Sequence, residues 1–469
     1  MDQDSSGFYI FGGGQTNYLS GGYNSTFFIK TDLSGNQIIF ENYSKEHTRW
    51  YTGESGELIK INGNKFIACG ALSAEENYGL LYCFDQNGDT VFTRKFLGDG
   101  YTIFYNTDYR NDTIYLIGGT QDTETLKISM YLVAVDTLGN TYWEQRYRYP
   151  LASEIGLTVD HFSNGNLVVS GAIENSPDDL ATDGKMYKTD AEGNDYFEKK
   201  YGTGFDDSGI SAKISADEQH IYAMQAMDTA IYPGNYEFPR YIGKMDTAGH
   251  FIWRTFFSKE YLLSFWQFRE NADGSIIACG VEVTTDGGPF VGYITKLDSS
   301  GNILWERHYT EDPMYDAYLM DVQQTEDKGY ILSGSAVGPV MGDPNAQMWL
   351  LKLDSMGCLV PGCDEITAID SKPQTAGADF IIYPNPVHDM ATVEVQIPDA
   401  LQIIAGKNLE LQVIDMQGRL TDIPTNISLT NGGETIRFQI QTSAFAQGSY
   451  MAVILYNNTI LGSSQWVKM

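Results

Sequence analysis

One short turn returns at a near-constant distance along the chain, and this repeat limits the fold more than any other feature. In each copy an aspartate is followed three residues later by a glycine, and successive aspartates are 51 to 56 residues apart. The aspartates of these turns are Asp32, Asp85, Asp136, Asp190, Asp246, Asp298 and Asp354. Similarity at a fixed period indicates a repeat architecture, in which each repeat is one small group of secondary-structure elements.

Each repeat has the pattern of four short strands, which we call a, b, c and d. An apolar run ending at glycine precedes the turn, as in "IIACG" (276–280) and "YILSG" (330–334). A variable loop and another apolar run follow, such as "MWLLKLD" (348–354). Aromatic and β-branched residues favour strands, whereas Asp and Gly favour tight turns. We therefore predict that the Asp-x-x-Gly turn joins strand c to strand d.

A single four-stranded sheet cannot bury both of its faces, but sheets stacked around an axis can. The sequence therefore predicts an all-β fold in which residues 1–364 form a seven-bladed β-propeller with four-stranded blades. A linear β-solenoid is the alternative, although its repeats are usually shorter. The first repeat opens directly with strand b, "GFYIFGGG" (7–14). We expect the first blade to lack its inner strand, and we expect a strand and a signal peptide before Met1 in the natural chain.

These repeats resemble bacterial β-propeller repeats that read "DGGYILAGST…YLIKLDSNGNVLWEKTYGG". The phrase "KLDSSGNILWERHY" (296–309) carries the likeness most fully, and the resemblance covers roughly residues 7–364. It implies the propeller fold and implies no particular function.

The tail has a different pattern. Residues 365–379 are polar and predict a linker, and the alternating segments of 380–469 predict a small antiparallel β-sandwich. Short motifs of the tail lie at Tyr383, Pro384, Asn385, Pro386, Asp415, Gly418, Gly448, Tyr450 and Lys468. With these motifs the tail resembles the type A C-terminal sorting domain of the type IX secretion system of Bacteroidetes. The resemblance implies the type IX machinery as a partner, export across the outer membrane, and release or anchoring at the cell surface.

The composition excludes some partners. The formal net charge is -31, so the surface is expected to repel nucleic acid and anionic membranes. Such a surface attracts divalent cations, but a solvated exterior is the simpler interpretation. No apolar run reaches the eighteen residues of a transmembrane helix. We predict no cofactor and no dedicated metal site, with a divalent cation left open.

Two sites of covalent chemistry are predicted. Cys358 and Cys363 flank Leu-Val-Pro-Gly, a turn that can bring two Cβ atoms within disulfide range, and disulfides are common in exported proteins. Asp246-Thr247-Ala248 resembles the O-glycosylation acceptor of Bacteroidetes, which makes Thr247 a candidate. Ordinary turn chemistry is the competing explanation of that tripeptide.

The sequence shows no catalytic constellation. The six His are scattered over different strand types, without a Ser-His-Asp order or a zinc-binding helix motif. We therefore predict a non-catalytic, secreted or surface-anchored propeller that binds a glycan, peptide or matrix ligand. The alternative is an extracellular enzyme that acts on a polysaccharide or peptide at the mouth of the central channel, and a third possibility is a rigid spacer.

The loops predict which end of the propeller binds. The b–c loops vary greatly, and in a four-stranded meander they lie at the same end as the d–a links, where variable loops usually bind ligands. The predicted ligand-binding residues of these links are Trp50, Tyr101, Phe205, Asp207, Trp266, Tyr315 and Asp316. Aromatic faces beside carboxylates suit sugars, peptides or a cation. The competing explanation is that the aromatic residues only pack between blades.

Overall fold

The computed structural model describes most of the chain. The described residues are 1–16, 23–43, 48–53, 57–74, 76–147, 152–176, 179–203, 207–227, 229–232, 235–237, 239–257, 262–283, 287–310, 315–337, 347–359, 379–396, 409–415, 420–421, 425–430, 435–443, 445–456 and 459–469. They contain no helix of the length and apolar character needed to cross a membrane. The chain divides into two compact units, Met1–Asp364 and Glu365–Met469.

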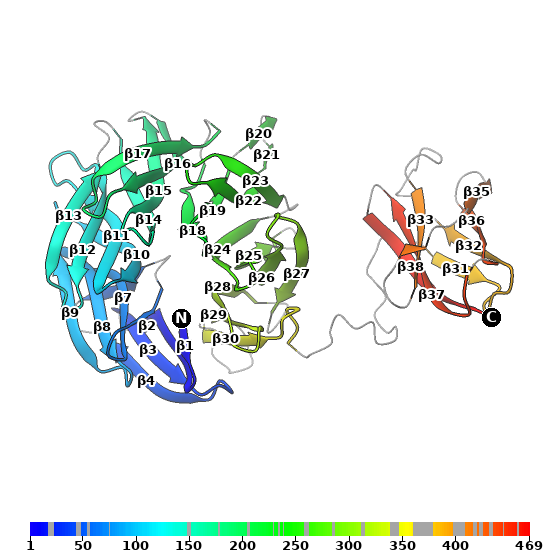
Figure 1. Ribbon diagram of the computed structural model, residues 1–469, viewed down its shortest axis with the longest axis horizontal. Helices are drawn as coiled ribbons and strands as arrows, with labels where there is room; N and C mark the ends of the chain where they lie inside the picture. Colours follow the sequence, from blue (N-terminus) through cyan, green and yellow to red (C-terminus); the bar gives the residue numbers. More distant parts are fainter. Residues whose placement is uncertain are drawn as a thin grey trace. The chain divides into compact units, whose positions relative to one another are not determined.

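The first unit is a series of antiparallel sheets that follow one another in chain order (Figure 1). The first sheet contains β1 (Asp2–Asp4), β2 (Gly7–Thr16), β3 (Tyr23–Thr31) and β4 (Gln37–Tyr43). The second contains β5 (Arg49–Thr52), β6 (Ile59–Ile61), β7 (Lys65–Ser73), β8 (Asn77–Asp85) and β9 (Thr90–Phe96). The third contains β10 (Thr102–Arg110), β11 (Thr113–Gln121), β12 (Ile128–Asp136) and β13 (Thr141–Tyr147).

The series continues in the same pattern. The next sheet contains β14 (Glu154–His161), β15 (Leu167–Ser176), β16 (Asp179–Thr189) and β17 (Asp195–Tyr201). After it come β18 (Ser211–Ile214), β19 (His220–Ala226), β22 (Arg240–Asp246) and β23 (Phe251–Phe257), with a separate hairpin of β20 (Thr229–Tyr232) and β21 (Asn235–Glu237). The last two sheets contain β24 (Leu263–Glu270), β25 (Ile276–Val283), β26 (Phe290–Leu297) and β27 (Ile303–Tyr309), then β28 (Ala317–Gln324), β29 (Tyr330–Ala336) and β30 (Gln347–Leu353).

Buried apolar residues join each sheet to the next. Pairs that share a core cluster across successive sheets are Phe28 and Phe66, Leu81 and Leu116, Leu132 and Val169, Met186 and Ile221, Ile242 and Ala278, and Ile294 and Leu332. A further cluster contains Ile331 of β29 together with Phe8, Ile10 and Ile29 of the first sheet. The last sheet therefore packs on the first. A closed ring of radial antiparallel sheets is a β-propeller, and the closure excludes a linear solenoid.

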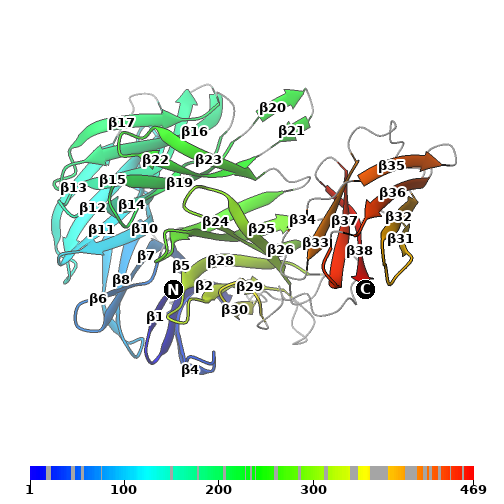
Figure 2. The ribbon, with the colours of Figure 1, turned by 45° about the vertical axis from the view of Figure 1, so that its right-hand side comes forward.

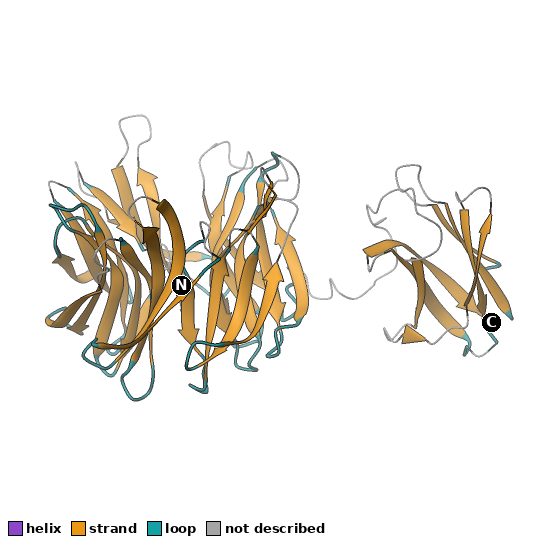
Figure 3. Ribbon diagram, turned by 90° about the horizontal axis from the view of Figure 1, so that it is seen from above, coloured by secondary structure: helices purple, strands orange, loops and turns teal. Residues whose placement is uncertain are grey.

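Within each sheet, the strands are ordered from the inside of the ring to the outside. Strands β10, β14, β18, β24 and β28 lie on the inside, and β9, β13, β17 and β27 lie on the outside (Figure 1). Seen from the side, the strands run between two ends, where the loops and turns gather (Figure 3). The inner strands therefore bring residues of different repeats together at the centre of the ring.

The repeated turn has the same hydrogen bonds in every copy. In each, the glycine N–H donates to the aspartate carbonyl at 2.9–3.1 Å, and one Oδ of the aspartate accepts the N–H four residues later. The glycine φ angles lie between 71° and 88°, in the left-handed region that L-residues with a Cβ avoid. This geometry explains why glycine returns with each repeat.

The aromatic residue that ends many outer strands fastens one sheet to the next. The Tyr147 hydroxyl donates to the Gly193 carbonyl at 2.7 Å, and the Tyr201 hydroxyl donates to the Gly249 carbonyl at 3.0 Å. Tyr43 and Tyr309 make the same bond to Gly88 and Gly357. Each of these tyrosines thus bonds to the Asp-x-x-Gly turn of the following sheet, one repeat further along the chain.

The prediction for the first blade was wrong. The first sheet has an inner strand of its own, β1, in which Asp2 pairs with Tyr9 and Asp4 with Gly7. The prediction assumed that too few residues precede strand b to supply both a strand and a turn. Two residues are enough for a hairpin turn, and three for a short strand, so the sheet is complete.

The second unit contains two four-stranded sheets (Figure 2). One has the order β31 (Asp379–Tyr383), β32 (Met390–Gln396), β36 (Thr435–Gln441) and β35 (Thr425–Thr430). The other has the order β34 (Leu420–Thr421), β33 (Leu409–Asp415), β37 (Gly448–Tyr456) and β38 (Thr459–Lys468). Val393 and Phe438 of the first sheet share one core with Val413 and Trp466 of the second.

Candidate functional site

The inner strands share an irregularity that sets which side chains reach the centre of the ring. The pairing register shifts between Phe104 and Asn106 in β10, Gly156 and Thr158 in β14, Phe265 and Gln267 in β24, and Leu319 and Asp321 in β28. A bulge of this kind re-aims side chains and is common beside functional sites. The residue just after each shift is polar, which places polar groups at one level of four inner strands.

Glu57 reaches across the centre of the ring. It precedes β6 of the second sheet, yet its carboxylate forms ion pairs with Lys213 of β18 and, at 3.0 Å, with Arg269 of β24. The Gln267 amide donates to the same carboxylate at 3.2 Å. Because the second sheet is adjacent to neither of the sheets that hold its partners, this contact can form only through the centre.

Arg269 extends this set of ion pairs to the last inner strand. Its Nη2 lies 3.1 Å from Oδ1 of Asp321, and its Nε donates to the Val322 carbonyl at 2.7 Å. The Met1 ammonium lies 2.7 Å from the other oxygen of Asp321. We call Met1, Glu57, Lys213, Gln267, Arg269 and Asp321 the ion-pair network.

The charges of the network stabilise one another. Burial tends to raise the pKa of Glu57, but Arg269 and Lys213 more than offset it and hold that pKa well below its usual range. Burial likewise opposes the charge of Asp321, yet the Met1 ammonium and Arg269 keep its pKa low. Two carboxylates therefore face three cationic groups, and both stay ionised at neutral pH.

A second charged group lies on β10 and β14. Asp108, Asp160 and His161 each offer one potential ligand atom, and these atoms all lie within 4.8 Å of one another. In the described part of the chain no other three His, Cys, Asp or Glu residues meet in this way. The Nδ1 atom of His161 contacts Oδ2 of Asp108 and lies 4.0 Å from Oδ1 of Asp160. We call these three residues the Asp–Asp–His group.

The surroundings of Asp160 oppose the ionisation of its side chain. Burial, followed by the neighbouring Asp108 carboxylate, raises the pKa of Asp160 to about 6. The Ile214 N–H donates to Oδ2 of Asp160 at 2.7 Å, and the His161 N–H donates to Oδ1 at 2.8 Å. These bonds fix the orientation of the carboxylate, and an imidazole with two fixed carboxylates can bind a cation or exchange a proton.

Sequence reasoning missed the Asp–Asp–His group and predicted no metal site. Asp108 and Asp160 are 52 residues apart, which is one repeat, and each lies two residues after the polar residue that follows a bulge. An alignment of the inner strands would have placed them side by side. The position of Glu57 has no equivalent signal, since it depends on the path of an irregular segment.

The predicted ligand-binding residues divide into exposed and buried ones. Tyr101, just before β10, and Trp266, at the bulge of β24, are 43% and 37% exposed. Trp50 instead packs on the core between the first two sheets, with its ring 6.0 Å from that of Tyr82. Packing between blades thus accounts for Trp50, whereas it leaves much of Tyr101 and Trp266 in contact with solvent. Tyr315 is half-buried.

The predicted carboxylates at this end accept hydrogen bonds from backbone N–H groups. Asp207 is buried, and its carboxylate accepts the Thr203 backbone N–H at 2.5 Å and the Thr203 hydroxyl. An Asp316 oxygen accepts the Phe290 N–H at 2.9 Å. Both aspartates therefore hold loop backbone in place. Phe205 lies outside the described residues.

The covalent predictions fall in two turns of the propeller. Cys358 is disulfide-bonded, while Cys363 lies outside the described residues. The other cysteines, Cys69, Cys83 and Cys279, are free and buried. Thr247 is half-buried in its turn, where its carbonyl accepts a hydrogen bond from Lys188 Nζ at 2.9 Å, and its glycosylation stays a prediction.

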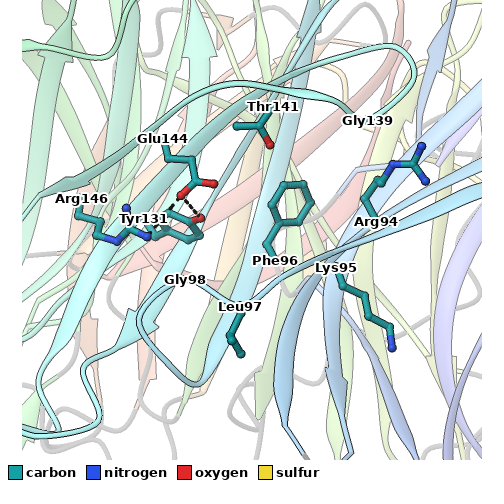
Figure 4. A pocket seen from close by; sticks show the side chains of 10 residues that line it. All are labelled: Arg94, Lys95, Phe96, Leu97, Gly98, Tyr131, Gly139, Thr141, Glu144 and Arg146. Atoms are coloured by element: carbon teal, nitrogen blue, oxygen red, sulfur yellow. Dashed lines mark hydrogen bonds and ion pairs between the residues drawn. The ribbon is translucent and has the colours of Figure 1, made fainter.

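A pocket of about 310 Å³ lies near the outside of the ring between β9 and β13 (Figure 4). Arg94, Lys95 and Arg146 give it a cationic lining. The guanidinium of Arg146 stacks 4.8 Å from the Tyr131 ring centre and pairs with Glu144 at 3.3 Å. The Tyr131 hydroxyl donates to the same glutamate at 2.7 Å. Arg146 is thus already engaged with the protein's own groups.

In the tail, the structure brings the two ends of the predicted sorting motif together. Asn385, within the Tyr-Pro-Asn-Pro segment, accepts the Val467 N–H on its side-chain oxygen at 3.0 Å. The Lys468 ammonium donates to the His388 carbonyl. Tyr450 stacks on the buried Trp466 with ring centres 5.0 Å apart. Asp415 ends β33, the described Gly448 begins β37, and Gly418 lies outside the described residues.

Comparison with known proteins gives a family for the tail alone. Residues 381–467 match the family model of the secretion system C-terminal sorting domain. No curated protein is similar in sequence to the chain. Because the family model covers less than half of the chain, it describes the tail only.

Solved structures with some likeness include two β-propeller domains. The β-propeller domain of the Trilobed protease from Pyrococcus furiosus is 12% identical, with a TM-score of 0.42, over 78% of this chain and 96% of that one. A putative 6-phosphogluconolactonase from Bacteroides uniformis is 10% identical, with a TM-score of 0.42, over 76% and 99%. The WD40 β-propeller domain of Doa1 is 8% identical, with a TM-score of 0.40, over 66% and 82%. Likenesses of this size carry no argument about activity.

The tail therefore decides where the protein goes. The match to the sorting-domain family agrees with the motif residues, and the structure places the two ends of that motif in contact. The chain is a β-propeller protein with a C-terminal sorting domain, exported by type IX secretion and either secreted or attached to the cell surface.

Proposed function

We propose that the protein is a non-catalytic, seven-bladed propeller from the Bacteroidetes that binds a glycan, peptide or matrix ligand outside the cell. In this proposal each sheet of residues 1–364 other than the β20–β21 hairpin is one blade, and the two sheets of the tail form the sandwich that directs export. The ligand binds at the end of the ring that carries the b–c loops and the starts of the inner strands.

One observation carries the binding proposal, namely the exposure of Tyr101 and Trp266. Large aromatic side chains usually pack in the core, as Trp50 does here. Tyr101 and Trp266 belong to rigid inner strands or their immediate starts, and each keeps more than a third of its surface exposed. Exposed aromatic rings on a rigid scaffold bind sugar faces and peptide side chains at little entropic cost.

The test is a glycan and protein array probed with the full chain. We expect at least one class of ligand to bind, and Trp266→Ala or Tyr101→Ala to weaken its binding by about 1–3 kcal/mol, as for interface hot spots. Tyr142→Ala is the matched control, because Tyr142 is 59% exposed on the outer strand β13. Equal binding by all four proteins would contradict the proposed face.

A second candidate function is an extracellular hydrolase that acts on a polysaccharide or peptide. The convergence of Asp108, Asp160 and His161 favours it, since a carboxyl group with a raised pKa beside a second carboxyl group is an arrangement that general acids use. Incubation with extracellular polysaccharides and peptides should release products that disappear in Asp160→Asn. A lack of any product would leave the binding function as the better account.

A further inference from the structure

We propose that Asp108, Asp160 and His161 bind one first-row divalent cation of the Zn²⁺ or Mn²⁺ class at the centre of the ring. This inference goes beyond the proposed function and does not depend on which extracellular ligand the propeller binds.

The carboxylates of the Asp–Asp–His group are less well compensated by positive charge than those of the ion-pair network. Among the described residues, the carboxylates of the ion-pair network each face cationic groups of the protein. The Asp–Asp–His group has two carboxylates and a single imidazole. The cations on its own strand and on the next inner strand are paired elsewhere, Arg110 with Glu218 at 3.7 Å and Lys213 with Glu57. A bound cation would supply the positive charge that the described residues do not bring to this group.

Backbone hydrogen bonds hold the two proposed carboxylate ligands in place. Buried carboxylates are normally fixed by second-shell hydrogen bonds when they bind a metal. Oδ1 of Asp108 accepts the Tyr109 N–H at 2.8 Å, which leaves Oδ2 directed to His161. Asp160 is held by the backbone N–H groups of Ile214 and His161. All three side chains retain between 16% and 24% exposure, so a hydrated ion can reach them and keep water ligands.

The proposed ligand atoms suit some metal ions better than others. Ca²⁺ and Mg²⁺ favour sites made of oxygen alone, whereas an imidazole nitrogen with two carboxylates suits Zn²⁺ and Mn²⁺. A tetrahedral ion with bonds of about 2.1 Å needs its ligand atoms roughly 3.4 Å apart. The contact between His161 Nδ1 and Asp108 Oδ2 is shorter than this, so the ion would move these two atoms apart as it enters between them.

The experiment is calorimetric titration of the full chain, first stripped by a chelator, with ZnCl₂, MnCl₂ or CaCl₂. We expect one equivalent of Zn²⁺ or Mn²⁺ to bind, Ca²⁺ to bind at least tenfold more weakly, and His161→Gln to weaken Zn²⁺ binding at least tenfold. His308→Gln is the matched control, because the His308 imidazole lies 2.9 Å from a carboxylate, that of Glu282, outside the Asp–Asp–His group. No binding to the wild-type chain, or equal losses in both variants, would overturn the proposal.

A second measurement uses only the wild-type chain and so does not depend on the folding of a variant. Diethyl pyrocarbonate modifies accessible imidazoles, and mass spectrometry locates the modified residue. We expect Zn²⁺ to slow the modification of His161 at least fivefold and to leave that of His308 unchanged. Equal protection of both residues, or protection of neither, would show that the ion does not bind at the Asp–Asp–His group.

Discussion

Two regions at the centre of the ring use the same kinds of residue in opposite ways. In the ion-pair network, carboxylates from the second and last sheets face cations, and the pKa values of Glu57 and Asp321 are held low. In the Asp–Asp–His group, two carboxylates from neighbouring sheets face each other, and the pKa of Asp160 is raised. Burial opposes ionisation in both regions, but the cations of the network outweigh it, whereas the Asp108 carboxylate adds to its effect on Asp160.

The ion-pair network serves the fold, whereas the Asp–Asp–His group is available for a ligand. The network links sheets that are not neighbours, and its charges are satisfied by the chain itself. The Asp–Asp–His group is satisfied only in part by the chain. Strain of this kind, maintained inside a rigid scaffold, is typical of functional sites.

The largest effect is expected from removing the central cation of the network. Arg269→Met leaves Glu57 and Asp321 without their shared partner, and breaking a buried pair in this way costs about 3–5 kcal/mol. Arg269 keeps 22% of its side chain exposed, so we expect the lower end, about 3 kcal/mol. Denaturant unfolding of the full chain measures the loss. A loss below about 1 kcal/mol would contradict a structural role for the network.

A smaller effect with a distinct pH dependence is expected from Glu57→Gln. The folded pKa of Glu57 lies below its ordinary value of 4.5, so its ionised form stabilises the fold above that pH and this contribution is lost as the pH falls below it. We expect the variant to be less stable by about 1–2 kcal/mol at neutral pH, with the difference shrinking under acid. Unfolding curves of both proteins between about pH 7 and pH 3 test this. A difference that grows under acid would contradict the pairing.

The tyrosine hydrogen bonds between successive sheets should contribute equally to stability on the two sides of the ring. Tyr147→Phe lies beside the Asp–Asp–His side of the ring and Tyr309→Phe beside the network side. Each removes one buried hydroxyl bond, and we expect each to cost about 1 kcal/mol. Phe96 and Phe257 occupy the equivalent strand positions naturally. Unequal costs in thermal unfolding would show that blade packing, rather than the central charges, separates the two regions.

The smallest effect, and a contrasting sign, is expected from Asp108→Asn in the absence of metal. The substitution removes one of two like charges, and the amide can still accept the Tyr109 N–H and donate to His161. We expect stability to stay the same or to rise by up to about 1 kcal/mol. Chelator-treated protein, unfolded in denaturant, gives the answer. A loss as large as that of Arg269→Met would mean that both regions are structural.

Most of the fold could be predicted from the repeat, because the repeated turn depends only on nearby residues. The Asp-x-x-Gly turn needs a capping carboxylate and a glycine with positive φ, and both are visible in the sequence at each copy. The inner strand of the first sheet was missed because its turn is only two residues long. That error came from assuming a longer connection between the first two strands.

The centre of the ring was harder to predict because it combines residues that no local pattern connects. Asp108 and Asp160 occupy equivalent repeat positions and could have been aligned, but Glu57 lies in an irregular segment whose path across the ring follows from packing. The predicted aromatic residues show a second limit of prediction from sequence. The sequence places Trp50 and Trp266 in equivalent links, and only the structure distinguishes the packed ring from the exposed one.

Anomalous diffraction from a crystal of the full chain, soaked in ZnCl₂ and recorded at the zinc absorption edge, would locate the bound ion directly. We predict one strong peak at the centre of the ring, bonded to Asp108, Asp160 and His161 at about 2.0–2.2 Å. We also predict no peak among Glu57, Arg269 and Asp321. Peaks only at surface carboxylates or at His308, with none at the Asp–Asp–His group, would contradict this prediction.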